Sequence, residues 1–175
     1  MTHQLSWIKF TEEALQALIN RDLQRASTLV GAKLGPYFIT DDAVRRWNNR
    51  LNQFRQDSRT LDWIARIVMA NGEVVGHAGF HGPPDQVGMV EVAYSVVPAH
   101  RGQGYAKSML RDLLKQASSE PEIRVVRATI RPDNVASLAT IRPFGFVHKG
   151  EQLDDIDGLE YIFEVDPESF QTEVD

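Results

Sequence analysis

Apolar residues recur along the chain with two spacings, one typical of helices and one typical of strands. Between residues 105 and 117 they fall three and four positions apart, which places them on one helix face. The same spacing runs more loosely through 12–31 and 41–54. We therefore predict three helices, each with one buried face. The clearest stripe consists of Ala106, Met109, Leu110, Leu113, Leu114 and Ala117.

The segment 89–97 alternates apolar and polar side chains, as a half-buried strand does. Tyr94 lies on the valine side of this strand, and Glu91 and Ser95 lie on the other side. Asn71-Gly72 and Asp157-Gly158 are typical hairpin turns. A short helix is expected from Asp133 or Asn134 to Pro143. Further strands are predicted at 5–10, 62–70, 73–80, 123–130, 146–152 and 159–165.

Hairpins predict antiparallel strand pairs, and one strand-helix-strand unit predicts a parallel pair. The fold class that follows is mixed α/β (α+β), with a central, mostly antiparallel, twisted sheet and helices on both faces. Residues 1–166 are expected to form a single domain. The last residues, 167–175, are expected to fray because little holds such a terminus down.

The composition restricts the class of protein. A chain of 175 residues can bury one core without covalent staples. The absence of cysteine excludes disulfides, thiolate metal sites and a cysteine nucleophile. No apolar run is long enough to span a membrane, and no signal peptide is recognisable. We expect a cytoplasmic protein without membrane contact.

The charge balance is mildly acidic. Nineteen lysines and arginines against 24 aspartates and glutamates give a net charge of -5. A nucleic-acid-binding protein is more often basic, so we expect no nucleic-acid partner. A negative chain suits a cationic partner, although the charge also serves solubility.

Two glycines, Gly102 and Gly104, follow Arg101 at the junction of the alternating strand and the clearest helix. The first N–H groups of a helix are unpaired and carry partial positive charge, so they bind anions. Glycine lets the backbone come close to such an anion because it has no side chain. This stretch therefore predicts a pyrophosphate cradle.

Two common phosphate-binding motifs do not fit this stretch. A P-loop requires lysine and then serine or threonine directly after its last glycine, but Tyr105 and Ala106 follow Gly104. The dinucleotide fingerprint has a third glycine where Lys107 stands. That fingerprint also belongs to the first strand of a longer sheet, and here several strands precede it.

A third pattern fits, and its second half appears further along the chain. The order of the predicted elements and both motif halves resemble the GCN5-related N-acetyltransferases (GNAT family) over nearly the whole chain. The closest pattern is that of the branch that acetylates ribosomal-protein N-termini, which also contains small-molecule enzymes. The matching residues are Val96-x-Pro98, Arg101-x-x-Gly104-x-Ala106, Asn134-x-x-Ser137 and Gly145-Phe146.

The resemblance implies a GNAT-like acyl-CoA acyltransferase fold and acetyl-CoA as the co-substrate, with no metal. The acetyl group would pass to a primary amine by direct attack in a ternary complex. Backbone groups of Val96 and Val97 would bind the pantetheine arm and the thioester. Asn134 would bond the pantetheine or a nearby water. The pyrophosphate would lie beside Arg101, on the N–H groups of Gly102, Gln103, Gly104, Tyr105, Ala106 and Lys107.

An alkyl amine, with a pKa of ~10.4, is almost fully protonated at pH 7, so a base is useful. Glu91, on the central strand, is the candidate base. It could instead be a rim carboxylate in water or a partner of an arginine. Many relatives carry a tyrosine as general acid where Ile141 stands here. Ser137 could replace it, or the Ser137 hydroxyl could cap the short helix and another tyrosine or a water could serve as the acid.

The acceptor site is the least determined part. Acidic residues between the last two strands would attract a cationic amine, or they are simply a solvated turn: Asp154, Asp155, Asp157 and Glu160. His77 and His81 lie too far apart on a strand to share a metal ion. A non-catalytic acyl-CoA-binding or sensing module of the same fold is the alternative function. Homodimers are common among relatives, so a dimer is also expected.

Overall fold

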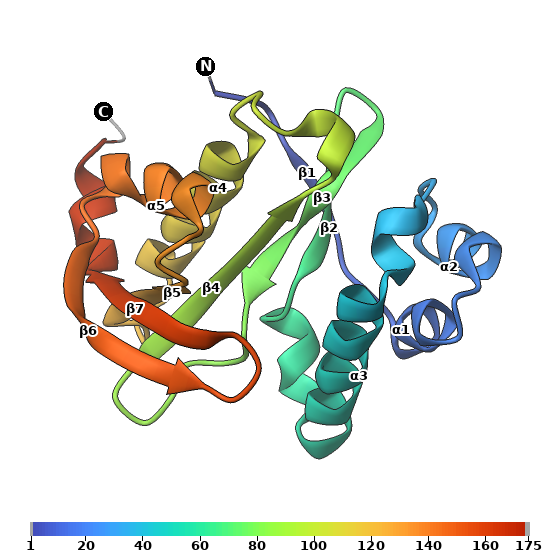
Figure 1. The fold of residues 1–175 in the computed structure, drawn as a ribbon, viewed down its shortest axis with the longest axis horizontal. Coiled ribbons are helices and arrows are strands. Elements are labelled where there is room, and N and C mark those ends of the chain that lie inside the picture. Colours follow the sequence, from blue (N-terminus) through green and yellow to red (C-terminus); the bar gives the residue numbers. More distant parts are fainter. Residues whose placement is uncertain (1, 174–175) are drawn as a thin grey trace.

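The strands form one seven-stranded sheet in the order β1-β2-β3-β4-β5-β7-β6 (Figure 1). The structure is a computed structural model and describes residues 2–173. Neighbouring strands are antiparallel except β4 and β5, which are parallel. The mostly antiparallel mixed sheet predicted from the sequence is therefore confirmed. The strands are β1 Ser6–Ile8, β2 Arg66–Ala70, β3 Glu73–Phe80, β4 Met89–Val96, β5 Val125–Ile130, β6 Val147–Asp154 and β7 Gly158–Val165.

Helices cover both faces of the sheet (Figure 1). The first three lie on one side, and α4 and α5 lie on the other. Short 3-10 turns connect them at Pro36–Ile39, Ser58–Asp62, Pro98–His100 and Arg142–Phe144. The α-helices are α1 Glu12–Ile19, α2 Leu23–Val30, α3 Asp41–Gln56, α4 Tyr105–Ser119 and α5 Val135–Ile141.

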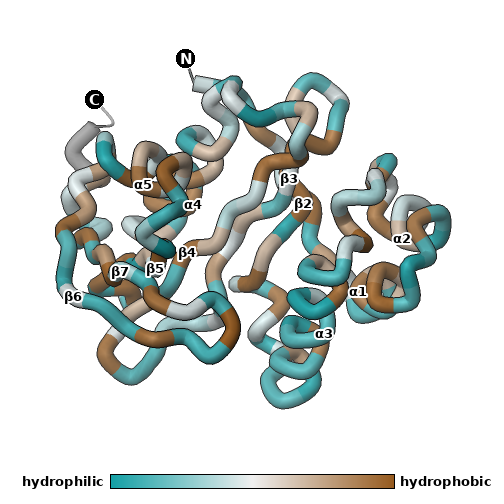
Figure 2. Tube along the Cα trace, in the orientation of Figure 1, coloured by the Kyte–Doolittle hydropathy of each residue, from teal (hydrophilic) through white to brown (hydrophobic). Residues whose placement is uncertain are grey.

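Each face of the sheet has its own hydrophobic core. Trp47 of α3 is fully buried and packs with Phe38 and α1 against one face. The apolar stripe of α4, including Met109 and Leu113, packs on the other face. Figure 2 shows hydrophilic residues over much of α3, whose inner side carries the tryptophan. Burial of these apolar side chains supplies the main driving force for folding.

The predicted helix over 12–31 is in fact two helices. Arg21 has a left-handed backbone (φ 59°), which ends the first helix. The Asp22 carboxylate accepts a hydrogen bond from the Arg25 N–H at 3.0 Å and caps α2. The Arg21 side chain donates to the Ile39 carbonyl and pairs with Asp41. The apolar spacing continues through this break, so periodicity alone did not indicate it.

Three boundaries also differ from the prediction. The strand predicted to begin at residue 62 begins at Arg66, and Asp62 ends a 3-10 turn, Ser58–Asp62. Asp154 accepts hydrogen bonds from two N–H groups of the following residues, so the β6–β7 turn holds three residues rather than two. The segment expected to fray from residue 167 forms a 3-10 turn, Pro167–Glu173, and the Phe170 ring lies 6.2 Å from that of Phe144. Residues 174–175 lie outside the described residues.

Gly79 of β3 offers a test of how tightly the sheet is packed. A Cβ atom there would lie 2.5 Å from backbone atoms of Ile64, which cannot move aside as a side chain would. We expect Gly79→Ala to lower the free energy of unfolding by about 3 kcal/mol. Gly35→Ala is the control, because its Cβ would meet nothing within 4 Å. Equilibrium urea unfolding measures both, and equal midpoints would contradict the close approach.

Candidate active site

The two central strands pair over a short length and then part. β4 and β5 are in register only from Met89–Val125 to Glu91–Arg127, whereas β4 runs on to Val96. The remainder of β4 keeps its pairs with β3. The edge of β4 that faces away from β3 is therefore open beyond Glu91.

A cavity of about 670 Å³ lies where the strands have parted. Its walls come from the end of β4, the turn that leads into α4, and α5. Most of the predicted cofactor-binding residues meet in it, although they are scattered along the sequence. The lining consists of Tyr94, Ser95, Val96, His100, Arg101, Gly102, Gly104, Tyr105, Ala106, Lys107, Asn134, Ala136, Ser137 and Thr140.

The start of α4 is open toward a ligand. Gly102 (φ 75°) and Gly104 (φ 88°) both have left-handed backbones, which glycine adopts without strain. Gly104 is the N-cap residue, and no side chain caps the helix there. The first N–H groups of α4 are thus left for an anion, and Lys107 adds a positive charge beside them.

Two residues predicted to bind the cofactor, Val97 and Gln103, are not among those that line this cavity. The Val97 N–H donates to the Val75 carbonyl at 2.9 Å, so it serves the sheet and is not free for pantetheine. Val97 borders a different hollow, between the segment 33–38 and the β2–β3 turn. Gln103 does not line the cavity either; its side chain donates to the Ala99 carbonyl at 3.3 Å.

Arg101 ties the end of β4 to the segment Pro36–Ile39. Its Nε donates to the Val96 carbonyl at 3.1 Å, and its guanidinium lies 5.7 Å above the Tyr37 ring. The Tyr37 hydroxyl in turn hydrogen-bonds to Ser95. This side chain therefore braces the cavity wall as well as adding positive charge to it. Tyr37 had no signal in the sequence that linked it to the site.

Glu91 lies on the α3 side of β4, close to the point where the strands part. Its carboxylate accepts a hydrogen bond from the Thr129 hydroxyl of β5. The His81 Nδ1 lies 3.7 Å from the same oxygen. The side chain keeps 20% of its surface exposed. Glu91 is therefore held in place yet open to a substrate or a water molecule.

Burial lowers the pKa of His81, and this effect outweighs the opposing influence of Glu91. The guanidinium groups of Arg50 and Arg46 lower the His81 pKa further. The imidazole is thus neutral at pH 7 and does not neutralise Glu91. Burial also lowers the Arg50 pKa to about 10, which leaves this guanidinium charged. Arg50 and Gln53 both donate to the His81 carbonyl at 3.0 Å and fix that turn.

On the opposite face of β4, Tyr94 and Ser137 form a hydroxyl pair in the cavity. Their side chains are hydrogen-bonded, and burial raises the Tyr94 pKa to about 12. Tyr94 therefore keeps its proton at neutral pH. The cap of α5 is Asn134, whose side-chain oxygen accepts from the Ser137 N–H at 3.1 Å. The Ser137 hydroxyl is thus not the helix cap.

The β6–β7 hairpin brings a second carboxyl group near Glu91. Burial raises the pKa of Glu160, and the negative charges of Asp154, Asp157 and Glu91 raise it further. Gln152 donates to the Glu160 carboxylate at 3.0 Å. The acidic residues of this hairpin thus differ in role, since Asp154 shapes the turn while Glu160 faces the site.

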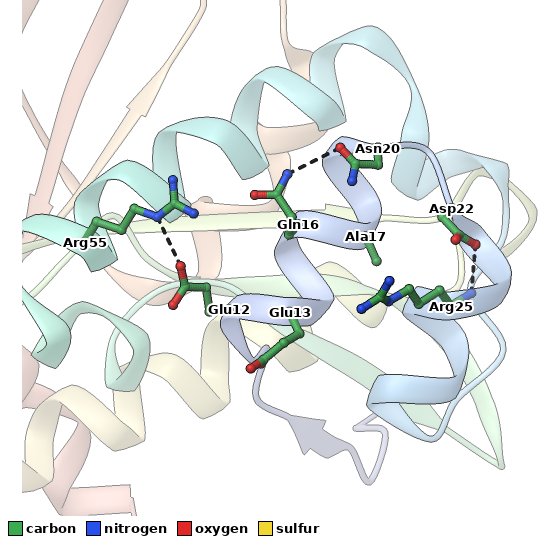
Figure 3. A pocket seen from close by; sticks show the side chains of 8 residues that line it. All are labelled: Glu12, Glu13, Gln16, Ala17, Asn20, Asp22, Arg25 and Arg55. Atoms are coloured by element: carbon green, nitrogen blue, oxygen red, sulfur yellow. Dashed lines mark hydrogen bonds and ion pairs between the residues drawn. The ribbon is translucent and has the colours of Figure 1, made fainter.

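A second hollow, of about 270 Å³, lies by α1, α2 and α3 (Figure 3). Three of its charged side chains have partners within the chain: Glu12, Asp22 and Arg55. Arg55 pairs with Glu12 at 3.1 Å, and Asp22 caps α2 beside Arg25. None of the residues predicted to bind cofactor lies there.

Two further findings concern metals and membranes. Across residues 2–173 there is no group of three or more histidine, aspartate or glutamate side chains arranged to hold a metal ion. In the same part of the chain no helix combines the length and the apolar character that crossing a membrane requires.

The comparison with known families agrees with this geometry. Residues 8–147 match the acetyltransferase (GNAT) domain. The chain belongs to the GNAT family. Six of the residues that carry the GNAT resemblance line the cavity at the β4–β5 parting: Val96, Arg101, Gly104, Ala106, Asn134 and Ser137. The family, and the enzyme class of acetyl-CoA-dependent acyltransferase, agree with the sequence prediction.

Individual relatives share sequence or fold with this GNAT protein. An uncharacterised N-acetyltransferase of Bacillus subtilis, YjdG, is 33% identical over 92 residues, or 51% of this chain. That match spans only about half (54%) of YjdG.

Two solved structures are similar in fold. A spermidine N-acetyltransferase SpeG chimera of Vibrio cholerae and hSSAT has a TM-score of 0.66 at 14% identity and covers 97% of this chain and 99% of its own. RimL, a ribosomal L7/L12 alpha-N-protein acetyltransferase in complex with coenzyme A, has a TM-score of 0.64 at 16% identity, with 95% of each chain covered.

Buried histidine near the site makes the fold acid-sensitive. Burial lowers the pKa of His77 to about 3 from the usual 6.5, and Arg46 and Arg50 add to this. Below pH 6.5 the unfolded chain therefore binds a proton that the folded chain does not. We expect the free energy of unfolding to decrease as the pH is lowered. His77 alone should account for a loss of about 2 kcal/mol at pH 5.

Urea unfolding at pH 5 to 8 measures this dependence. His77→Phe should flatten the acid slope, leaving the smaller part from His81, whose pKa is lowered as well. His148→Phe, at an exposed position on β6, serves as the control. An acid slope unaltered by His77→Phe would show that this histidine is not the cause.

Proposed function

We propose that this protein is an N-acetyltransferase that moves the acetyl group of acetyl-CoA to a primary amine within a ternary complex. One observation carries the proposal. The cavity at the β4–β5 parting has an uncapped helix start in its wall and is lined by Tyr94, Ser95 and Val96 of β4, the strand that carries Glu91. A long ligand with a phosphate group and a reactive thioester fits such a site.

The cofactor end of the cavity binds the anionic part of acetyl-CoA. The pyrophosphate accepts hydrogen bonds from N–H groups between Gly102 and Lys107, where the helix dipole favours negative charge. The pantetheine arm then runs along the free edge of β4 past Val96, with Asn134 on the facing wall. Because these contacts come mainly from the backbone, they hold the thioester at the parting of the strands.

Glu91 is the base that prepares the acceptor. The amine must lose a proton before its nitrogen can attack the thioester carbon, and Glu91 takes it directly or through a water. The C–N bond forms as the C–S bond breaks, the electron pair leaves with the thiolate sulfur, and the second proton that the nitrogen sheds ends on that sulfur as the CoA thiol. The Thr129 hydroxyl orients the Glu91 carboxylate. Because His81 is neutral, the negative charge of Glu91 remains available.

The hydroxyl pair serves the leaving group. A thiol with a pKa of ~8.5 leaves readily, so it needs a hydrogen bond more than a strong acid. Ser137 donates this hydrogen bond, and Tyr94, which keeps its proton, orients the serine. This pair takes the place of the tyrosine that relatives carry where Ile141 stands here.

The acceptor is a cationic primary amine, either of a small molecule or of a protein N-terminus. Glu160 and Glu91 place negative charge on the side of β4 opposite the hydroxyl pair. Proteins of similar fold are named as acetyltransferases of spermidine and of a ribosomal-protein N-terminus, both of which are amines. The cytoplasmic location and the homodimer remain predictions from the sequence.

Acetyl-CoA should stabilise the protein. A ligand at about 100 times its Kd adds about 2.7 kcal/mol, which raises the Tm by several degrees in a chain of this size. Gly104→Ala should abolish the shift, because its Cβ would lie at the cradle. Gly145→Ala is the control, because Gly145 also has a left-handed backbone (φ 73°, against 88° for Gly104) but does not line the cavity. This variant should have a lower Tm without ligand and yet keep the increase in Tm with acetyl-CoA.

Thermal melts with and without acetyl-CoA provide the measurement. An unshifted wild type at millimolar acetyl-CoA would overturn the proposed cofactor. A shift without turnover on any amine would favour the acyl-CoA-binding module instead.

Glu91→Gln should lower kcat about 100- to 10,000-fold, the usual contribution of a general base. Glutamine can still accept the Thr129 hydrogen bond, so the fold and the KM for acetyl-CoA should be unchanged. Release of the CoA thiol, followed with a panel of amines, gives the rates. Glu151→Gln, an exposed position on β6, is the control. An unchanged kcat in Glu91→Gln would remove this residue from the mechanism.

A further inference from the structure

The N-terminal residues ahead of β1 lie across the start of α4. Figure 1 shows the N-terminus beside the loop that enters this helix. The His3 N–H donates to the buried Ser108 hydroxyl at 3.1 Å, and Arg111 donates to the Thr2 hydroxyl at 3.3 Å. The His3 ring stacks on the Tyr105 ring, with centroids 4.1 Å apart. These contacts fix His3 beside the phosphate cradle.

From this position His3 makes a hydrogen bond to the cradle itself. Its Nε2 lies 2.7 Å from the Gln103 carbonyl oxygen. A carbonyl oxygen can only accept, so Nε2 carries the hydrogen in this contact. This donor is available in the neutral and in the protonated ring.

The bond sets the direction of the next N–H group. The peptide between Gln103 and Gly104 is trans and planar, so its C=O and N–H point to opposite sides. With the carbonyl turned toward His3, the Gly104 N–H is turned away from it. Gly104 lines the cavity whereas Gln103 does not, in agreement with this direction.

The orientation of this peptide depends on the backbone angles of Gln103 and Gly104. Gly104 has a left-handed backbone (φ 88°), and glycine passes easily between such states, so its side of the peptide offers little resistance to turning. A carbonyl that accepts a hydrogen bond also polarises its peptide and strengthens the N–H as a donor. An outside donor at the Gln103 carbonyl is thus both an orienting and a strengthening contact.

We infer that His3 is a positioning residue for the phosphate cradle: it holds the Gln103–Gly104 peptide so that the Gly104 N–H faces the diphosphate of the acyl-CoA. The inference rests on the proposed function. His3 acts through the peptide and does not touch the cofactor. Its effect is therefore confined to ligands that carry the diphosphate.

The test compares two acyl donors by calorimetry and by steady-state kinetics. Acetyl-CoA carries the diphosphate, and S-acetylpantetheine lacks it. The chain is made with a native N-terminus, with any tag at the C-terminal end. The variants are His3→Ala, His3→Gln, whose amide N–H replaces the imidazole donor, and His148→Ala on β6 as a control whose ring also contacts aromatic neighbours.

We expect His3→Ala to weaken acetyl-CoA binding about 3- to 10-fold, the net worth of one hydrogen bond. The KM for acetyl-CoA should rise while kcat stays unchanged. The affinity for S-acetylpantetheine should be the same in His3→Ala as in the wild type. His3→Gln should recover most of the affinity for acetyl-CoA, and His148→Ala should match the wild type. The Tm without ligand should barely change, since β1 begins only at Ser6.

Equal acetyl-CoA affinity in the wild type and His3→Ala would overturn the inference. An equal loss for both donors would overturn it as well, because a general disturbance of the site would then be the cause. A wild type that binds no acetyl-CoA would instead refute the proposed function. The two failures are therefore distinguishable within one experiment.

Discussion

The parting of β4 from β5 after Glu91 is the constraint on which the site depends. Three parallel pairs hold the strands together, and beyond them β4 keeps its strand pairing with β3 alone. That second attachment is tight, because a Cβ on Gly76 of β3 would lie 2.0 Å from the Ser95 carbonyl. β4 can therefore leave one neighbour without losing its place. A sheet paired along its whole length would have no edge to offer a ligand.

The parting also gives the two faces of β4 different tasks. Because side chains alternate along a strand, Glu91 and Ser95 face α3 and the Pro36–Ile39 segment, while Tyr94 faces α5. The thioester would lie at the edge between these faces. In the proposed mechanism, a base for the amine and a hydroxyl pair for the sulfur would then approach it from opposite sides. Charge follows the same division, with the carboxyl groups of Glu91 and Glu160 on one side and the positive cradle at the far end of the cavity.

The sequence was sufficient for features whose cause is local. The strand of Glu91, the stripe of α4 and the glycine turn are each specified by residues within one segment, and the structure contains all three. Contacts between distant segments had no such signal. The Tyr94–Ser137 pair, the Tyr37–Ser95 bond and the His3–Gln103 bond each join residues more than 40 positions apart. They depend on how the helices pack, which periodicity does not specify.

The difference between local features and contacts of distant segments also explains why the family resemblance lies in the phosphate cradle. The SpeG and RimL structures share this fold at 16% identity or less. A cradle made of backbone N–H groups and left-handed glycines requires few particular side chains, so it survives large changes of sequence. Under the proposed function, the acceptor side would be built from side chains on α3, the Pro36–Ile39 segment and the β6–β7 hairpin. Substitutions there would change charge and shape directly, so these elements, rather than the motif that identifies the family, would determine which amine is acetylated.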